Sequence, residues 1–465
     1  MKLRNIIIIL LFLLFSGSIR KADAQVLTLK DAIQTALTNY GTIKAKAEYL
    51  NASKATVKQA KRDYLPNVSI SAEQNYGTVN GQYGPLYGFS GLEVSSSGPV
   101  TGVNSWNAAF GGLYLTNVNW DFFAFGRAKD KISVAQSAVV RDEADWQQEQ
   151  FQQEIRVTGV YLNLLAAQRL IVSWQKNLDR ADTLRAVTVL RAKNGLIPGV
   201  DSSEANAEVS NAKIALTQAI DAEQVQANEL ALLMGIPPAD FVTDTLFISH
   251  LPIDINTATA ISIQDHPVLK YYKSRIDFSN QQVKYFRTFN YPTFSFFGVY
   301  QDKASGFYAD YLQNPGAFTG NYGTGVNPTI SNYLLGVGVT WNLTDPLRVS
   351  KQVAAQIYTS KGLQDEYDLM YQQEKDQLIL SDTKITNAIN NYKEAPIQVK
   401  AASDAYTQRT VLYKHGLNNI VDLTQALYTL NRAEIDMDIA YTNVWQALLL
   451  KAAASGDFKI FIDNF

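Results

Sequence analysis

The chain has 465 residues, and its 41 Lys and Arg residues nearly balance its 43 Asp and Glu residues. Without a basic excess, we expect no nucleic-acid partner. Cysteine is absent and only three histidines occur, which excludes disulfides, thiolate metal sites and cysteine nucleophiles, and makes any metal site or cofactor unexpected. Charged residues make up 18% of the chain, below the roughly 25% of an average soluble protein.

The N-terminal segment has the pattern of an export signal. Lys2 and Arg4 precede an unbroken apolar run at residues 6–15, and Ala22-Asp23-Ala24 follows as a cleavage motif. The run is too short to span a bilayer as a helix, which takes about 20 residues. We therefore predict a signal peptide at residues 1–24, with a retained membrane anchor as the alternative. No later stretch is apolar enough to predict a spanning helix.

The two halves of the chain repeat one pattern of residues. The pairs that share a residue type include Pro66 with Pro292, Trp120 with Trp341, Arg127 with Arg348, Gly195 with Gly416, and Gly235 with Gly456. We predict a first repeat at residues 25–235, a proline-containing linker or equatorial segment at 236–260, a second repeat at 261–456 and a C-terminal tail at 457–465.

Each repeat is predicted to contain helix, strand, long loop, strand, very long helix, tight turn and helix. Strands are expected at about 65–76, 110–122, 292–301 and 333–343, because apolar and polar residues alternate there. Residues 126–193 carry apolar side chains at spacings of three and four, as in a coiled coil. The segments 77–109 and 302–332 between paired strands are rich in Gly, Tyr, Asn and Ser, and loops of that length are usually functional or mobile.

The predicted strands have one strongly aromatic, apolar face, which is typical of a lipid-facing barrel surface. A sheet inside a bilayer must close on itself, and single barrels start at about 8 strands. The four strands of one chain cannot close a barrel, so several chains must combine. Two chains would give 8 strands and three would give 12, and the polar inner face favours the larger, water-filled barrel. The alternative is a soluble protein with a half-exposed sheet.

These features resemble the TolC family of outer-membrane efflux and secretion ducts. The resemblance covers essentially the whole mature chain and is carried by three marks: the junction Tyr64-Leu65-Pro66, the stretch from Trp120 to Arg127, and the Gly-Leu turn followed by Val-Asp in both repeats. It implies an α+β membrane protein with a long antiparallel α-helical coiled-coil barrel. Each chain of a homotrimer would give four strands to one 12-stranded transmembrane barrel. The implied partners are a periplasmic adaptor, an inner-membrane transporter and outer-membrane lipids.

The resemblance places a periplasmic aperture just after the second Gly-Leu turn. Asp422 matches the first of two acidic aperture residues of the family, whereas Gln425 and Asn418 depart from the acid and the arginine of its best-known member. Asp201 and Glu204 are the counterparts in the first repeat. Residues three positions apart share a helix face, so three chains would form rings of such side chains. The alternative is that an acid in a first helical turn only caps free N–H groups.

Two further sets of residues are candidates for contacts with partners. Gly195, Leu196, Gly416 and Leu417 lie at the predicted hairpin turns, where the resemblance implies contact with the adaptor; a glycine there also simply ends a helix. Trp120, Trp341, Arg127 and Arg348 lie beside the strand ends and are candidates for the membrane interface, although the arginines could equally be solvated helix starts. His266 and His415 are expected at the surface rather than as ligands.

The most favoured function is a passive outer-membrane duct that exports small molecules or proteins, extending into the periplasm. The alternative is a structural or adhesive outer-membrane protein that binds partners through its long outer loops. No Ser/His/Asp, paired-carboxylate or phosphate-loop arrangement is evident, so we do not expect an enzyme or a catalytic residue.

Overall fold

The structure is a computed structural model that describes residues 26–81, 100–244, 251–252 and 263–464. The predicted signal peptide and parts of the predicted linker and of the first long loop lie outside these residues. The chain divides into two compact units, which are described separately. The first comprises residues 1–51, 140–275 and 363–465, and the second comprises residues 52–139 and 276–362.

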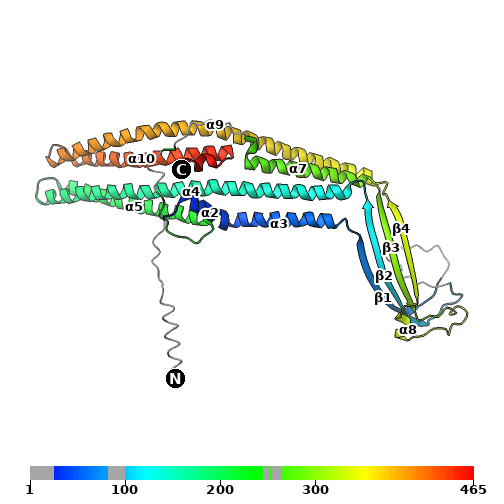
Figure 1. Ribbon diagram of the computed structural model, residues 1–465. Coiled ribbons are helices and arrows are strands. Elements are labelled where there is room, and N and C mark those ends of the chain that lie inside the picture. The colour runs from blue at the N-terminus through cyan, green and yellow to red at the C-terminus, as the bar shows by residue number, and fades with distance from the viewer. Residues whose placement is uncertain (1–25, 82–99, 245–250, 253–262, 465) are drawn as a thin grey trace, which may run out of the picture. The chain divides into compact units, whose positions relative to one another are not determined.

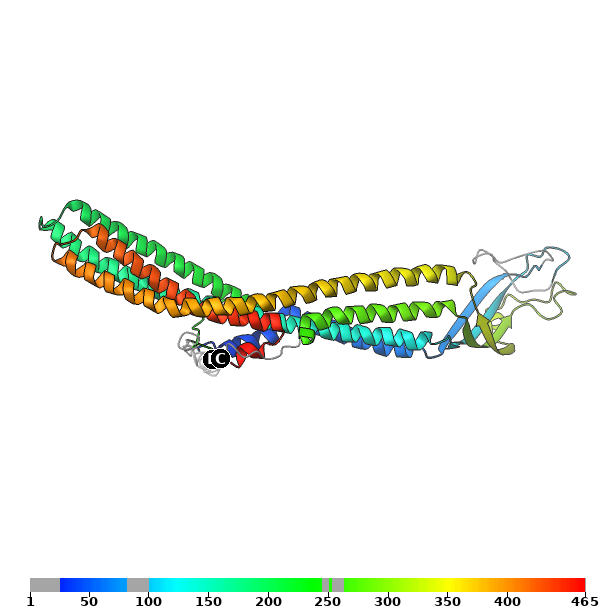
Figure 2. The same cartoon turned by 90° about the horizontal axis from the view of Figure 1, so that it is seen from above.

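The first unit is helical. It holds α2 (Leu29–Asn39), α5 (Gly199–Met234), α10 (Ile420–Ser455) and α11 (Lys459–Ile462), with most of α4 (Arg127–Lys193) and α9 (Asp345–Lys414). Figures 1 and 2 show α4, α5, α9 and α10 side by side as two helical hairpins. The short helix η1 (Ile263–Asp265) and the start of α7 (Pro267–Arg287) also belong to this unit.

The core of the first unit explains why α4 is so apolar. One window of α4 has a mean hydropathy of 1.2, enough by composition alone to cross a membrane, but 44% of that window is buried in the fold. Val157, Tyr161 and Leu164 of α4 pack with Trp445 of α10 and Phe461 of α11. The apolar stretch is therefore accounted for by burial against neighbouring helices. The segment predicted as a C-terminal tail contributes to this core through α11.

The expectation of a surface position for His266 is wrong. Only 1% of its surface is exposed, its Nε2 lies 3.0 Å from the carbonyl oxygen of Ala453, and its Nδ1 accepts from the backbone N–H of Val268. Burial lowers the pKa of His266, which favours the neutral ring. The expectation rested on the position of His266 before Pro267 at a helix start, and the local sequence does not show that this helix start packs against α10.

The second unit contains the sheet. Strands β1 (Asn67–Thr78), β2 (Ala108–Phe123), β3 (Thr293–Ser305) and β4 (Ile330–Thr340) form one antiparallel sheet in the order β1-β2-β3-β4. The helix α3 (Gly41–Arg62) leads into β1, and α7 and η2 (Thr288–Asn290) lead into β3. The short helix α8 (Tyr322–Val326) lies between β3 and β4. The predicted class, long helices with a four-stranded sheet, is confirmed.

The register gives the sheet two different faces. Ala72 pairs with Tyr114 and Thr116 pairs with Tyr300, which in turn pairs with Tyr333. Because paired residues share a face, one face is apolar and the other largely polar. The apolar face includes Val68, Ile70, Trp120, Tyr300, Tyr333, Leu335 and Val337, and the polar face includes Asn67, Ser69, Asn117, Gln301 and Asn332. Most of these apolar-face side chains are exposed in the single chain.

Candidate functional site

The two hairpin turns of the first unit have the same backbone geometry. Gly195 and Gly416 have φ values of 69° and 73°, the left-handed region that glycine tolerates best. The N–H of Leu196 donates to the carbonyl of Arg191 at 2.9 Å, and the N–H of Leu417 donates to that of Leu412 at 2.9 Å. This bonding satisfies the last helical carbonyls and turns the chain sharply. Leu196 and Leu417 are left exposed at the turns, at 67% and 74% of their surface.

The proposed aperture residues lie on the first turns of the helices that follow. Asp422 is half-buried, and one of its oxygens lies 3.5 Å from Arg409 of α9. Its backbone N–H donates at 2.8 Å to the side chain of Asn419, which caps α10. Gln425 is exposed one turn further along. The cap in the second hairpin is therefore Asn419, and the carboxylate of Asp422 remains available to other partners.

The first hairpin differs from the second in how the N-terminus of its second helix is capped. Pro198 precedes α5 and provides no side-chain cap. Asp201 is half-buried on the first turn of α5, like Asp422 on α10, and Glu204 is half-buried one turn further along, where the second hairpin has the exposed Gln425. In the second hairpin, Asn418 has a buried side-chain nitrogen with no hydrogen-bond partner among the described residues. The structure therefore brings Asp422 together with Arg409, and gives Asn418 no comparable contact within the described chain.

An arginine clamp that the sequence analysis missed joins the two hairpins beside these turns. Arg191 of α4 donates at 2.8 Å to the carbonyl oxygen of Tyr413 of α9, and its guanidinium lies 5.4 Å from the centre of the Tyr413 ring. The buried Tyr413 hydroxyl lies 3.3 Å from that of Thr188. These contacts fix the end of α9 against α4.

Further polar contacts lie along the same face of α4. Together with the contacts of Arg191 and Thr188 they form a row between the hairpins that we call the polar seam. Arg180 forms two hydrogen bonds of 2.7 Å with the carboxylate of Glu434 of α10, an arrangement that raises the pKa of Arg180. Ser173 donates at 2.8 Å to Asp438. The arginines at positions 169, 180 and 191 are spaced by about three helical turns, so they share one face of α4. That spacing is the signal in the sequence that could have revealed the seam.

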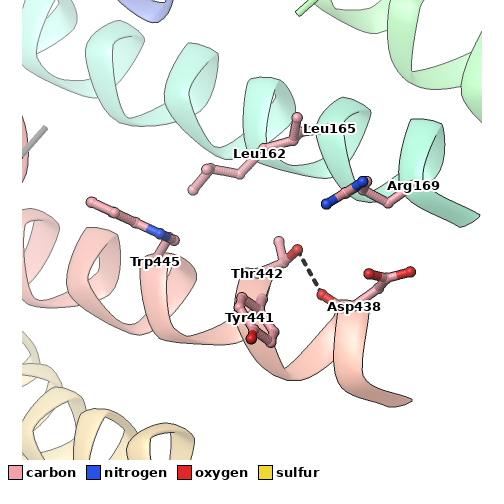
Figure 3. Close-up of a pocket in the computed structure, with 7 residues that line it drawn as sticks. All are labelled: Leu162, Leu165, Arg169, Asp438, Tyr441, Thr442 and Trp445. Carbon is pink, nitrogen blue, oxygen red and sulfur yellow. Dashed lines mark hydrogen bonds between the residues drawn. The ribbon is translucent and has the colours of Figure 1, made fainter. Parts of the chain in front are cut away.

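A small cavity lies at the inner end of this seam (Figure 3). Its volume is about 10 Å³, and Arg169 and Asp438 lie at one end of it, with Leu162, Leu165 and Trp445 toward the other. The cavity is the size of one water molecule. Burial raises the pKa of Asp438, opposed by the hydrogen bond from Ser173 and by the charges of Arg169 and Lys176. The described residues contain no group of ligands suited to a metal ion.

The membrane-interface candidates lie in the second unit. Trp120 donates at 2.8 Å to the carbonyl of Tyr64, just before β1, and Trp341 donates at 3.2 Å to that of Asn290, just before β3. The two repeats therefore use the same tryptophan contact to hold the start of a strand.

The two arginines beside these strands have different contacts. Arg127 donates at 3.0 Å to the Thr293 hydroxyl and lies 4.7 Å from the centre of the Phe289 ring, so its guanidinium is occupied inside its own unit. Arg348 is exposed and pairs with Asp345 at 3.2 Å.

One part of the chain is similar to a known protein family. Residues 32–236 match the model of the outer membrane efflux protein family. No curated protein sequence matches the chain significantly.

Solved structures of outer-membrane proteins share the fold of the chain. The structure of VceC from Vibrio cholerae has 17% identity, a TM-score of 0.73, and coverage of 92% of this chain and 96% of that one. The CmeC channel from Campylobacter jejuni has 13% identity, a TM-score of 0.72 and coverage of 92% and 85%. The open MtrE channel from Neisseria gonorrhoeae has 14% identity, a TM-score of 0.71, and matches the chain over most of its length. Residues 32–236 are therefore similar to the outer membrane efflux protein family, and the fold of the chain is the TolC-like outer-membrane channel fold.

Proposed function

We propose that the chain is the passive outer-membrane duct of a tripartite export system and works as a homotrimer. The observation that supports this best is a four-stranded sheet with an exposed apolar face and two open edges, β1 and β4. An open edge cannot persist in lipid, because its N–H and C=O groups would lack partners. Since the sheet is antiparallel throughout, β4 of one copy can pair with β1 of the next and keep the alternation.

Three copies would form a 12-stranded barrel, in which the polar face can line a water-filled interior and the apolar face can contact lipid. Eight strands would leave an interior filled by side chains, whereas 12 leave room for water along Asn67, Ser69, Asn117 and Gln301. The apolar face would then contact outer-membrane lipids. Trp120, Trp341, Arg127 and Arg348 would lie at the membrane interface on the side of the helices.

The hairpin turns are the proposed contact with partners in the periplasm. Leu196 and Leu417 are exposed beside Gly195 and Gly416, and exposed apolar side chains on rigid turns suit docking of an adaptor, which links the duct to an inner-membrane pump. The aperture is proposed at Asp422 and Gln425, with Asn418 beside them and Asp201 and Glu204 as the first-hairpin counterparts. In a trimer, the half-exposed Asp422 would form a ring of three carboxylates.

Single-channel recording tests both the duct and its aperture. The purified chain should form a trimer in detergent and give small, mostly closed conductances in a planar bilayer. Asp422→Ala removes the ring charge and the contact with Arg409, so we expect larger openings or altered ion preference. Asp436→Ala is the matched control, because Asp436 is also a half-exposed acid on α10, 3.8 Å from an arginine.

The two parts of the proposal fail separately. Inserted trimers that never conduct in either form would contradict the duct. Conducting trimers in which Asp422→Ala and Asp436→Ala behave alike would contradict the aperture assignment alone.

A further inference from the structure

The loop between β3 and β4, residues 306–329, has an unusual composition for an exposed segment. Asp310 is its only charged residue. Its aromatic residues are Phe307, Tyr308, Tyr311, Phe318 and Tyr322. Tyrosine is enriched where a membrane meets water, because its ring is apolar and its hydroxyl can hydrogen-bond. The composition is therefore that of an interfacial segment rather than of a water-exposed loop.

This loop is folded rather than extended into solvent. Phe307 packs against Tyr311, with ring centres 4.8 Å apart, and against Phe318 at 6.1 Å. The backbone N–H of Gly306 donates to the carbonyl of Phe110 at 2.8 Å, and the N–H of Thr319 donates back to Gly306 at 2.8 Å. The loop therefore holds a fixed position at the end of the sheet (Figure 1).

The helix α8 fixes the loop on the apolar face of the sheet. Tyr322 packs edge-on against Phe110, with ring centres 5.1 Å apart, and its hydroxyl donates at 2.7 Å to the side chain of Gln74. The hydroxyl of Tyr114 donates at 2.9 Å to the carbonyl of Val326. Gly325 allows this approach, because a Cβ there would lie 2.5 Å from the Cβ of Phe110. Gln74, Phe110 and Tyr114 all belong to the apolar face.

The spacing along β2 puts this cluster at the far boundary of a bilayer. Phe110, which contacts α8, and Trp120 are ten residues apart on the apolar face. That separation is about 33 Å along a strand. A strand tilt of 35–45° reduces it to about 25 Å, the height of the apolar band of a membrane barrel. Asp302 and Ser331 share the row of Tyr114, so a charged side chain already lies on this face four residues before Phe110 is reached from Trp120.

We propose that α8 and the β3–β4 loop lie in the lipid headgroup layer on the outside of the barrel and anchor it in the outer leaflet. This inference rests on the proposed function, since it requires the apolar face to meet lipid. The ligand is the polar–apolar boundary of the bilayer, contacted by the exposed tyrosines at positions 76 and 322. Because the loop is held on the outer face, it leaves the mouth of the duct open.

The absence of cysteine makes the test clean, since every introduced cysteine is the only thiol. Nitroxide labels would be placed at Ile70→Cys in the middle of the apolar face, Thr324→Cys on α8, and Asn332→Cys on the polar face near the same end of the sheet. In reconstituted trimers, the collision rates of each label with oxygen and with a water-soluble nickel chelate report its depth. We expect the oxygen-to-nickel ratio to be highest at Ile70, intermediate at Thr324 and lowest at Asn332.

Two results would contradict different parts of the reasoning. A Thr324 label as accessible to nickel as the Asn332 label, with Ile70 in lipid, would overturn the anchor and leave the duct intact. An Ile70 label that is equally accessible to nickel would overturn the lipid-facing sheet and hence the proposed function.

A substitution tests the contact that holds α8. Tyr322→Ala should lower the Thr324 ratio to that of Asn332, because it removes the ring contact and the hydrogen bond to Gln74. Tyr308→Ala is the matched control, since Tyr308 is exposed to nearly the same extent in the same loop, and it should leave the ratio unchanged. Equal effects of the two substitutions would show that the α8 contact does not hold the loop.

Discussion

The pair of Arg180 and Glu434 offers the sharpest test of the polar seam between α4 and α10. Its two hydrogen bonds are both 2.7 Å long, and the side chains are 24% and 16% exposed. Exposed ion pairs contribute about 0.2–1 kcal/mol, whereas removing one partner of a fully buried pair costs about 3–5 kcal/mol. This pair lies between those limits, so Arg180→Ala should weaken the contact between the hairpins by about 2 kcal/mol.

If the duct opens by separating α4 from α10, that loss should be visible in single channels. About 2 kcal/mol corresponds to a roughly 30-fold change in an equilibrium constant, so the ratio of open to closed time should rise by that order. Glu434→Gln should change the ratio of open to closed time less than Arg180→Ala does. The double variant should change it by less than the two single effects combined, because both substitutions remove the same ion pair. Arg185→Ala is the control, since Arg185 pairs with Asp182 of its own helix. Gating of Arg180→Ala equal to that of Arg185→Ala would refute the reasoning.

Three other predictions follow from the same structure. Ile70→Lys should reduce assembly in the membrane, because a lysine facing mid-bilayer lipid costs about 2–4 kcal/mol; Ser71→Lys on the opposite face of β1 should assemble normally, as measured by the yield of membrane trimers. Burial raises the pKa of Glu154 and of Glu374 from 4.5 to about 7, so stability should fall as pH rises from about 4.5 to about 7, and Glu374→Gln should flatten the dependence of the melting temperature on pH. Arg191→Ala should speed deuterium exchange at the end of α9, where Tyr413 loses its clamp, and unchanged exchange would contradict that role.

Local patterns in the sequence predicted the sheet and the long helices well. The alternation around Val68 and Ile70 depends only on neighbouring residues and on one burial environment, so it can be interpreted without a structure. The glycine turns at Gly195 and Gly416 follow equally from a local backbone requirement.

Contacts between distant segments could not be predicted in this way. Arg180 and Glu434 are 254 positions apart, and the sequence around either residue does not indicate that the other is its partner. His266 was expected at the surface because it precedes Pro267 at a helix start, and it is buried because α10 packs against it. The β3–β4 loop was expected only as a functional or mobile segment, since its fixed position depends on Tyr322 meeting Phe110 of another hairpin.

The two repeats have the same tryptophan contact at their strands, but the equivalent arginines beside the strand ends have different contacts. Each tryptophan holds the start of the partner strand through the same backbone contact. Arg127, however, contacts Thr293 and Phe289, across the boundary between the repeats, whereas the polar partners of Arg348 among the described residues are Thr344 and Asp345 of its own turn. An arginine that binds the other repeat fixes the position of β2 relative to β3, the one pair of strands that joins the two halves. The Arg127 contacts thus add to the β2–β3 ladder that joins the two hairpins into one sheet, and Arg348 has no equivalent contact among the described residues.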